Sequence, residues 1–222
     1  MRGITFLDAS NESFRRHTAD DWDLVMTKKV IGTPPVKWKT VELKDRDGDL
    51  DFTNALRGVP SYGSRELSFS FEYLGSPEEW STLVNDIRGF LHGRRLKIRE
   101  PDDLHYYYLG YAEMSDPTGG LVKSFTVTVR ADTWKYKNGS ATTVTETATA
   151  GTVIRLVNDW RPVVPRIRTT GAVTLSFNGT TYTISGAGSF RFPKMVLKYG
   201  LNPIEIVSGS GEITFTYQEG AI

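Results

Sequence analysis

The chain has 222 residues, no cysteine, three histidines, and 27 basic against 26 acidic side chains, for a formal net charge of +1. The absence of cysteine excludes a disulfide framework, a thiolate nucleophile and a cysteine-based zinc site. A near-neutral charge argues against a protein that coats nucleic acid. With 39% hydrophobic residues, no apolar run of about 18–20 residues and no signal-peptide core before Asp8, we expect a soluble globular protein made in a cytoplasm.

The first part of the chain predicts a sheet with one helix. Alternating apolar residues indicate strands at 36–44, 66–74, 96–99, 105–114 and 121–131. Ser76 and Glu79 form a capping-box pattern that places the helix N-terminus at Ser76, and Gly93 ends the helix. The apolar positions at helical spacing between them are Trp80, Leu83, Val84, Ile87, Phe90 and Leu91. This pattern is typical of an α+β domain in which an amphipathic helix packs on a sheet.

Composition changes near residue 137. Residues 1–137 carry 20 basic and 21 acidic side chains, whereas residues 138–222 carry 7 and 5 and are richer in threonine. Short alternating segments in the second part are separated by turn signals such as Asn178-Gly179, which favours an antiparallel β-sandwich. We therefore predict a mostly β protein with an α+β domain at 1–137 and a β-sandwich domain at 138–222.

Three clusters are candidate sites, and each has a simpler structural interpretation. Carboxylates alternate at Asp45, Asp47, Asp49 and Asp51, but the spacing does not match a calcium loop, and Asp47-Gly48 favours a tight hairpin turn. Asp102, Asp103 and His105 form an acid–base group that lacks a nearby nucleophile, so a solvated turn is favoured over a hydrolase site. Aromatic residues of the second part suggest either a sugar-stacking platform or ordinary core and rim positions: Trp160, Tyr182, Tyr199 and Tyr217.

No catalytic constellation, cofactor-binding motif or metal site emerges, so we expect a protein that binds or assembles rather than an enzyme. A β-rich protein must cover its sheet edges, and oligomerisation is one way to do so. The run Tyr106, Tyr107 and Tyr108 alternates across a strand, so its faces cannot all enter one small core. Either Tyr107 or the Tyr106 and Tyr108 pair is a candidate subunit contact, where tyrosine is enriched; the alternative is half-buried strand tyrosines.

The order of several segments resembles the distal tail proteins (Dit) of siphophages. In the first domain these are residues 47–53 (DGDLDFT), 60–71 (PSYGSRELSFSF), the helix ending in 90–93 (FLHG) and the return strand 95–98 (RLKI). In the second they are 156–167 (LVNDWRPVVPRI), 199–206 (YGLNPIEI) and 213–217 (ITFTY). The resemblance spans nearly the whole chain and implies that the second domain is a galectin-like sandwich.

The resemblance also implies a function. Such a protein forms a hexameric ring at the tip of a non-contractile phage tail, built by the first domain with the sandwich at its periphery. The ring joins the major tail tube protein to the tail-tip proteins and to a receptor-binding protein, and DNA passes through its lumen without specific binding. The Asp45 to Asp51 turn and the three tyrosines are then candidate assembly contacts. The rival hypothesis is a carbohydrate-binding module or adhesin that acts through the sandwich.

Overall fold

In the computed structural model, the described residues are 3–44, 47–55, 60–119 and 122–222. They form two compact units, Met1–Lys135 and Tyr136–Ile222. The fold is mostly β, with one helix among the described residues, which confirms the predicted class. Each unit has its own hydrophobic core.

The first unit contains one large antiparallel sheet in the order β2-β1-β7-β8-β10-β6-β3, with β9 paired to β10. A second, two-stranded ladder of β4 and β5 lies outside it. The elements are β1 (Thr5–Asp8), β2 (Arg15–His17), β3 (Leu24–Ile31), β4 (Thr40–Val41), β5 (Leu50–Asp51), β6 (Arg65–Tyr73), α1 (Trp80–Leu91), β7 (Arg95–Arg99), β8 (Tyr106–Met114), β9 (Thr118–Gly119) and β10 (Lys123–Ala131).

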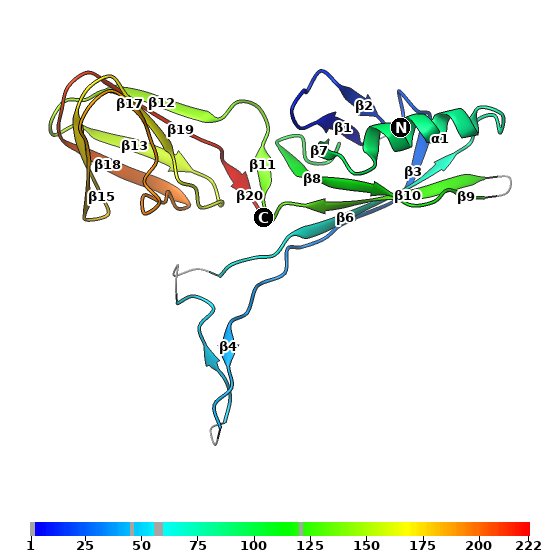
Figure 1. Cartoon of the computed structure of the whole chain (residues 1–222), viewed down its shortest axis with the longest axis horizontal. Coiled ribbons are helices and arrows are strands. Elements are labelled where there is room, and N and C mark those ends of the chain that lie inside the picture. The colour runs from blue at the N-terminus through cyan, green and yellow to red at the C-terminus, as the bar shows by residue number, and fades with distance from the viewer. Residues whose placement is uncertain (1–2, 45–46, 56–59, 120–121) are drawn as a thin grey trace. The chain divides into compact units, whose positions relative to one another are not determined.

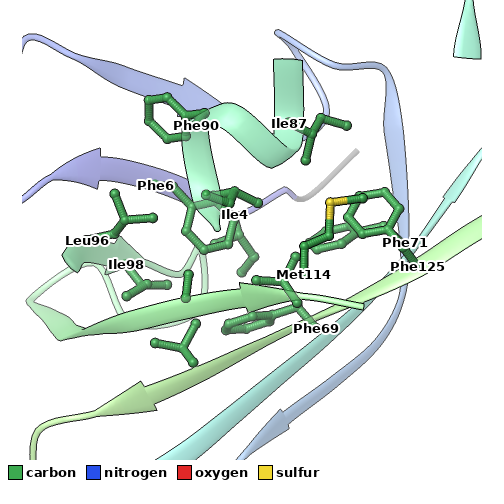
Figure 2. Close-up of a cluster of buried hydrophobic side chains, with 14 of the residues drawn as sticks. Ile4, Phe6, Phe69, Phe71, Ile87, Phe90, Leu96, Ile98, Met114 and Phe125 are labelled. Carbon is green, nitrogen blue, oxygen red and sulfur yellow. The ribbon is translucent and has the colours of Figure 1, made fainter. Parts of the chain in front are cut away.

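The core of the first unit lies between α1 and one face of the sheet, as Figure 2 shows. Strand β6 alternates buried Leu67, Phe69 and Phe71 with more accessible polar residues, as a sheet covered on one side requires. The helix contributes Val84, Ile87, Phe90 and Leu91 to the same core. The predicted helix face is therefore the one that packs.

The predicted helix start is wrong by about one turn, because α1 begins at Trp80 with Glu79 at its N-cap. Ser76 instead accepts a hydrogen bond at its Oγ from the Glu78 N–H at 3.3 Å, within a turn that precedes the helix. The Glu79 carboxylate accepts a hydrogen bond from the Tyr73 hydroxyl at 3.2 Å. The reciprocal capping box does not form in this arrangement.

Gly93 ends the helix as expected, with φ of +75° immediately after the C-cap His92. A Cβ at Gly93 would meet no atom within 4 Å, so the only cost of an alanine there is the strain of a left-handed backbone conformation. We expect Gly93→Ala to lower the free energy of unfolding by about 1–2 kcal/mol. The matched control is Gly89→Ala inside α1, which also meets open space and should raise stability by about 0.5–1 kcal/mol. Urea denaturation of both variants measures the difference; equal effects would contradict this explanation.

The second unit is a two-sheet antiparallel sandwich. One sheet has the order β12-β19-β14-β17 and the other β13-β18-β15-β16. Its elements are β11 (Lys135–Lys137, which begins at the unit boundary), β12 (Thr142–Thr147), β13 (Val153–Asn158), β14 (Arg166–Thr169), β15 (Val173–Phe177), β16 (Thr180–Ile184), β17 (Gly188–Phe190), β18 (Gly200–Gly209), β19 (Glu212–Tyr217) and β20 (Gly220–Ala221).

The Asn178-Gly179 signal produces the turn it predicts. Phe177 pairs with Thr180, so these two residues alone join β15 to β16. Both have positive φ, +48° for Asn178 and +74° for Gly179, as a type I′ hairpin turn requires.

Candidate assembly surface

Between β3 and β6, the described residues 32–44, 47–55 and 60–64 form an arm that leaves the sheet (Figure 1). Its two limbs are joined at the base by the bridge between Val36 and Tyr62. Further out, the Phe52 N–H donates to the Lys39 carbonyl at 2.7 Å, and Val41 pairs with Leu50. None of the described arm residues belongs to the core cluster. The arm is therefore a hairpin held mainly by its own ladder.

The arm is fixed to the sheet at its base. Both Nε and Nη2 of Arg65 donate to the Thr133 carbonyl, at 3.1 and 2.7 Å. The Thr133 hydroxyl donates to the Gly63 carbonyl at 2.8 Å, and the Tyr62 ring packs edge-on against Trp134. These contacts connect the second limb of the arm to the end of β10.

The ladder register gives the arm two different faces. Since side chains alternate along a strand, Val41, Leu43, Leu50 and Phe52 share one face, which we call the apolar face of the arm. Val41 is 48% exposed and Phe52 46% exposed. The opposite face carries Thr40, Glu42, Asp49 and Asp51, with Trp38 nearer the base at 70% exposure. An isolated two-stranded hairpin is marginal in water, and these exposed apolar groups are suited to burial against another surface.

The acidic run lies at the distal part of this arm. Asp45 falls outside the described residues, whereas Asp47 and Asp49 are exposed near the tip. The last described pair of the ladder is Val41 with Leu50, so residues 42–49 intervene and the expected two-residue turn at Asp47-Gly48 is not the pairing observed. The predicted strand at 36–44 is likewise shorter, with β4 covering only Thr40–Val41. Both differences are seen in the register, which pairs Val41 with Leu50 and Thr40 with Asp51.

Asp51 has a local structural role. Its Oδ1 accepts a hydrogen bond from the Thr53 N–H at 2.7 Å. The hydrogen bonds from Thr53, side chain first and then backbone, lower the pKa of Asp51 below its ordinary value of 3.8. The Thr53 hydroxyl also accepts from the Lys39 N–H at 3.0 Å, which ties this turn to the other limb.

This pKa shift predicts an acid-labile arm. A carboxyl whose pKa is lower in the folded state stabilises that state above its unfolded pKa, and the contribution is lost as the pH falls through the folded value. We expect exchange of the Thr53 amide hydrogen, relative to its intrinsic rate, to accelerate below about pH 4. Asp51→Asn should remove the pH dependence of this ratio. An unchanged ratio down to pH 2 would contradict the assignment.

The three tyrosines of β8 have different environments. Tyr108 is only 4% exposed, with the Arg65 guanidinium 5.3 Å from its ring centroid. Burial is the main cause that raises the pKa of Tyr108 to about 12. Tyr106 and Tyr107 are half-buried beside the Lys135 and Lys97 ammonium groups. Tyr108 thus has almost no exposed surface for a subunit contact. Tyr106 and Tyr107 remain the tyrosines that we propose as subunit contacts.

The acid–base group is divided among ion pairs. The Asp102 carboxylate lies 2.6 Å from the Lys29 ammonium, which also contacts the buried Glu100 at 2.7 Å. Asp103 pairs with Lys135 at 2.7 Å, and His105 is exposed. The turn between β7 and β8 is as predicted, but its acidic residues are not simply solvated, because Asp102 and Asp103 pair with lysines and Glu100 is buried.

The four aromatics of the sandwich do not form one platform. Tyr182 and Tyr217 are 8% and 3% exposed and belong to the core. Trp160 and Tyr199 are exposed and stack on each other with ring centroids 4.0 Å apart.

Among the described residues, no group of three or more metal-ligating side chains is suitably placed to hold a cation. No helix among the described residues is long and apolar enough to span a membrane.

Sequence reasoning missed the apolar face of the arm. The prediction relied on the carboxylates at alternate positions. Leu50, however, lies between Asp49 and Asp51, and Phe52 follows Asp51. The available signal was the alternation Leu-Asp-Phe at 50–52, which is typical of an amphipathic strand.

Comparison with solved structures identifies the fold. The chain is similar to the crystal structure of the SPP1 Dit protein, described as a paradigm of the hub adsorption apparatus in phages that infect Gram-positive bacteria. The TM-score is 0.67 at 15% identity, covering 97% of this chain and 98% of that chain. A chain of the phage P2 baseplate in its activated conformation with Ca gives a TM-score of 0.47 at 9% identity, covering 100% of this chain and 99% of that one. No protein-family model and no curated protein matches the sequence. The likeness to SPP1 Dit confirms the Dit-like fold expected from the sequence.

Proposed function

We propose that this protein is the hub of a non-contractile phage tail and assembles as a hexameric ring. The observation that carries the proposal is the exposed arm, set in a fold that matches SPP1 Dit over nearly its whole length. In this proposal, residues 1–137 build the ring and residues 138–222 form a peripheral sandwich. The protein acts as a structural component of the tail tip and has no catalytic role.

The arm suits a ring when its contact is heterologous. In this proposal one protomer offers the projecting hairpin, and its neighbour receives it on a different surface. Head-to-tail contacts of this kind close into a ring when the rotation between subunits allows it. Burying Val41, Leu43 and Phe52 in such a contact removes their apolar surface from water, which stabilises the assembly.

The charge of the chain suits a conduit for DNA. A net charge of +1 gives the ring little general attraction for phosphates, so DNA can pass without being held. The outward face of the large sheet is polar along β6 and β10, where Ser68 and Ser70 of β6 lie opposite Thr128 and Thr126 of β10. We propose that the ring connects the major tail tube protein to tail-tip proteins and a receptor-binding protein.

Electron microscopy of the negatively stained, purified full-length protein tests this function. We expect particles with sixfold rotational symmetry and a central opening. Mixing with the tube protein of the same phage should place the ring at one end of each tube. Rings that never associate with tubes would contradict the hub role, and particles without rotational symmetry would contradict the ring.

A further inference from the structure

A polar groove crosses the outer face of the sheet β12-β19-β14-β17 in the second unit. It has a volume of about 570 Å³ and is lined by Arg166 and Arg168 of β14, Ser189 of β17, and residues of β19. Arg166 pairs with Thr216 and Arg168 with Thr214, while Ser189 lies opposite Arg168. Because residues two apart on a strand point to the same side, both guanidinium groups face this groove. Its volume falls in the range of small-ligand sites.

Among the described residues, the two arginines of the groove have no acidic partner. Neither Arg166 nor Arg168 forms an ion pair with a described carboxylate, whereas Lys137 in the same unit pairs with Glu219 at 2.6 Å. Glu212 lies at the groove margin without an ion pair to either arginine, and its N–H donates to the Thr170 hydroxyl at 2.8 Å. A guanidinium stays protonated and offers a planar set of donors that matches an oxyanion.

Most of the remaining lining carries hydroxyl groups, from Thr170, Thr214, Thr216 and Ser189, and Glu212 adds one carboxylate. Thr169 also lines the groove but is 3% exposed, and its hydroxyl donates to the Gly171 carbonyl at 2.8 Å. No exposed large hydrophobic residue is among the described lining residues. A protein interface usually contains an apolar or aromatic centre, and a site for single-stranded nucleic acid uses aromatic rings for stacking. The groove has neither feature. Two guanidinium groups with hydroxyl groups around them instead match a ligand that has an anionic group and several hydroxyls.

We propose that this groove binds the phosphate ester of a polyol or sugar. The two guanidinium groups hold the phosphate oxygens in charge-assisted hydrogen bonds, and the threonine and serine hydroxyls contact the polyol hydroxyls. A tetrahedral phosphate suits two adjacent guanidinium groups because its several oxygens can serve both. The proposal concerns binding alone and is separate from ring assembly.

Titration of the full-length protein with glycerol 3-phosphate, followed by isothermal calorimetry and by amide chemical shifts, tests the proposal. The variant Arg166→Gln/Arg168→Gln removes both charges, and Arg155→Gln is the control, since Arg155 is exposed on β13 of the other sheet and pairs with Pro203. We expect affinity to fall at least about tenfold in the double variant and to stay unchanged in the control. Amide shifts in wild type should concentrate on β14 and β19.

Four reference ligands decide what is bound: inorganic phosphate, glucuronate, glycerol and a single-stranded oligonucleotide. Glycerol 3-phosphate should bind more tightly than each of them. Equal binding of inorganic phosphate would show a general anion site and overturn the polyol part of the proposal. Preference for glucuronate, or tighter binding of a single-stranded oligonucleotide, would overturn the assigned ligand class. Equal affinities in the double variant and wild type would overturn the site itself. The amide spectrum of the double variant confirms that it remains folded.

Discussion

If the protein assembles through the arm as proposed, Val41→Ser/Phe52→Ser is expected to convert the oligomer into monomers. Both side chains lie on the apolar face of the arm and are about half exposed in the protomer, so the proposed contact would bury apolar surface that the protomer leaves in water. Truncating a buried residue at the centre of an interface costs about 2 kcal/mol or more when that residue is a hot spot, although most interface residues cost less. In a closed ring each protomer repeats the loss, so native mass spectrometry should show complete dissociation at micromolar concentration.

The matched control acts on the other face of the same arm. Glu42→Ser/Asp49→Ser changes the same number of residues in the same hairpin and should leave the oligomer intact. Neither double variant should shift the thermal unfolding of the protomer core, because the arm lies outside the core cluster. If both variants assemble like wild type, the arm does not hold the ring together. If only the control dissociates, the wrong face of the arm has been assigned.

Phe69→Ala is expected to destabilise the first unit by about 3–5 kcal/mol. Phe69 is fully buried on β6 and meets Phe6 edge-on, with ring centroids 6.2 Å apart. The truncation leaves a cavity between the helix and the sheet that neighbouring rings cannot fill. Differential scanning calorimetry should show a lower unfolding temperature for the first unit.

The corresponding change in the second unit is Phe215→Ala, which removes a fully buried ring from β19. Because the two cores are separate clusters, we expect two calorimetric transitions, each lowered by only one of the variants. This outcome would support the proposed division into domains at 1–137 and 138–222. A single transition lowered equally by both variants would contradict two independently folding domains.

The strands and helix that sequence patterns predicted best are those with one buried face. Strand β10 alternates over its whole length in register with β6, and α1 presents a continuous apolar stripe. The alternation in β10 and the helical spacing in α1 are local patterns, so they can be recognised without knowledge of the tertiary contacts. The helix start was misplaced because the side chain of Glu79 contacts Tyr73, a tertiary contact that competes with the local capping pattern.

Two of the strands that the sequence did not predict, β3 and β12, have physical reasons for weak signals. In β3, a register shift between Met26 and Lys28 breaks the alternation, and the strand lies at the end of the sheet. In β12, Val144 is the only apolar residue, since this strand also lies at a sheet edge. Edge strands have fewer neighbours to bury, so their hydrophobic period is less distinct.

The sequence predicted the acidic run as a candidate assembly contact, and the structure places its described residues on the same arm as the apolar face. That this arm contacts another subunit stays a proposal. Which residues share a face, however, depends on the pairing of Val41 with Leu50 across the hairpin. A shift of one residue in that register would exchange the two faces. The apolar face of the arm therefore becomes visible only in the structure.

Light scattering coupled to size-exclusion chromatography of the wild-type protein tests the central claim most directly. A hexameric ring predicts a mass six times that of the 24.9 kDa protomer, constant over a tenfold dilution of the sample. A protein that remains at the protomer mass at the highest concentration, with and without the tube protein, would contradict the ring.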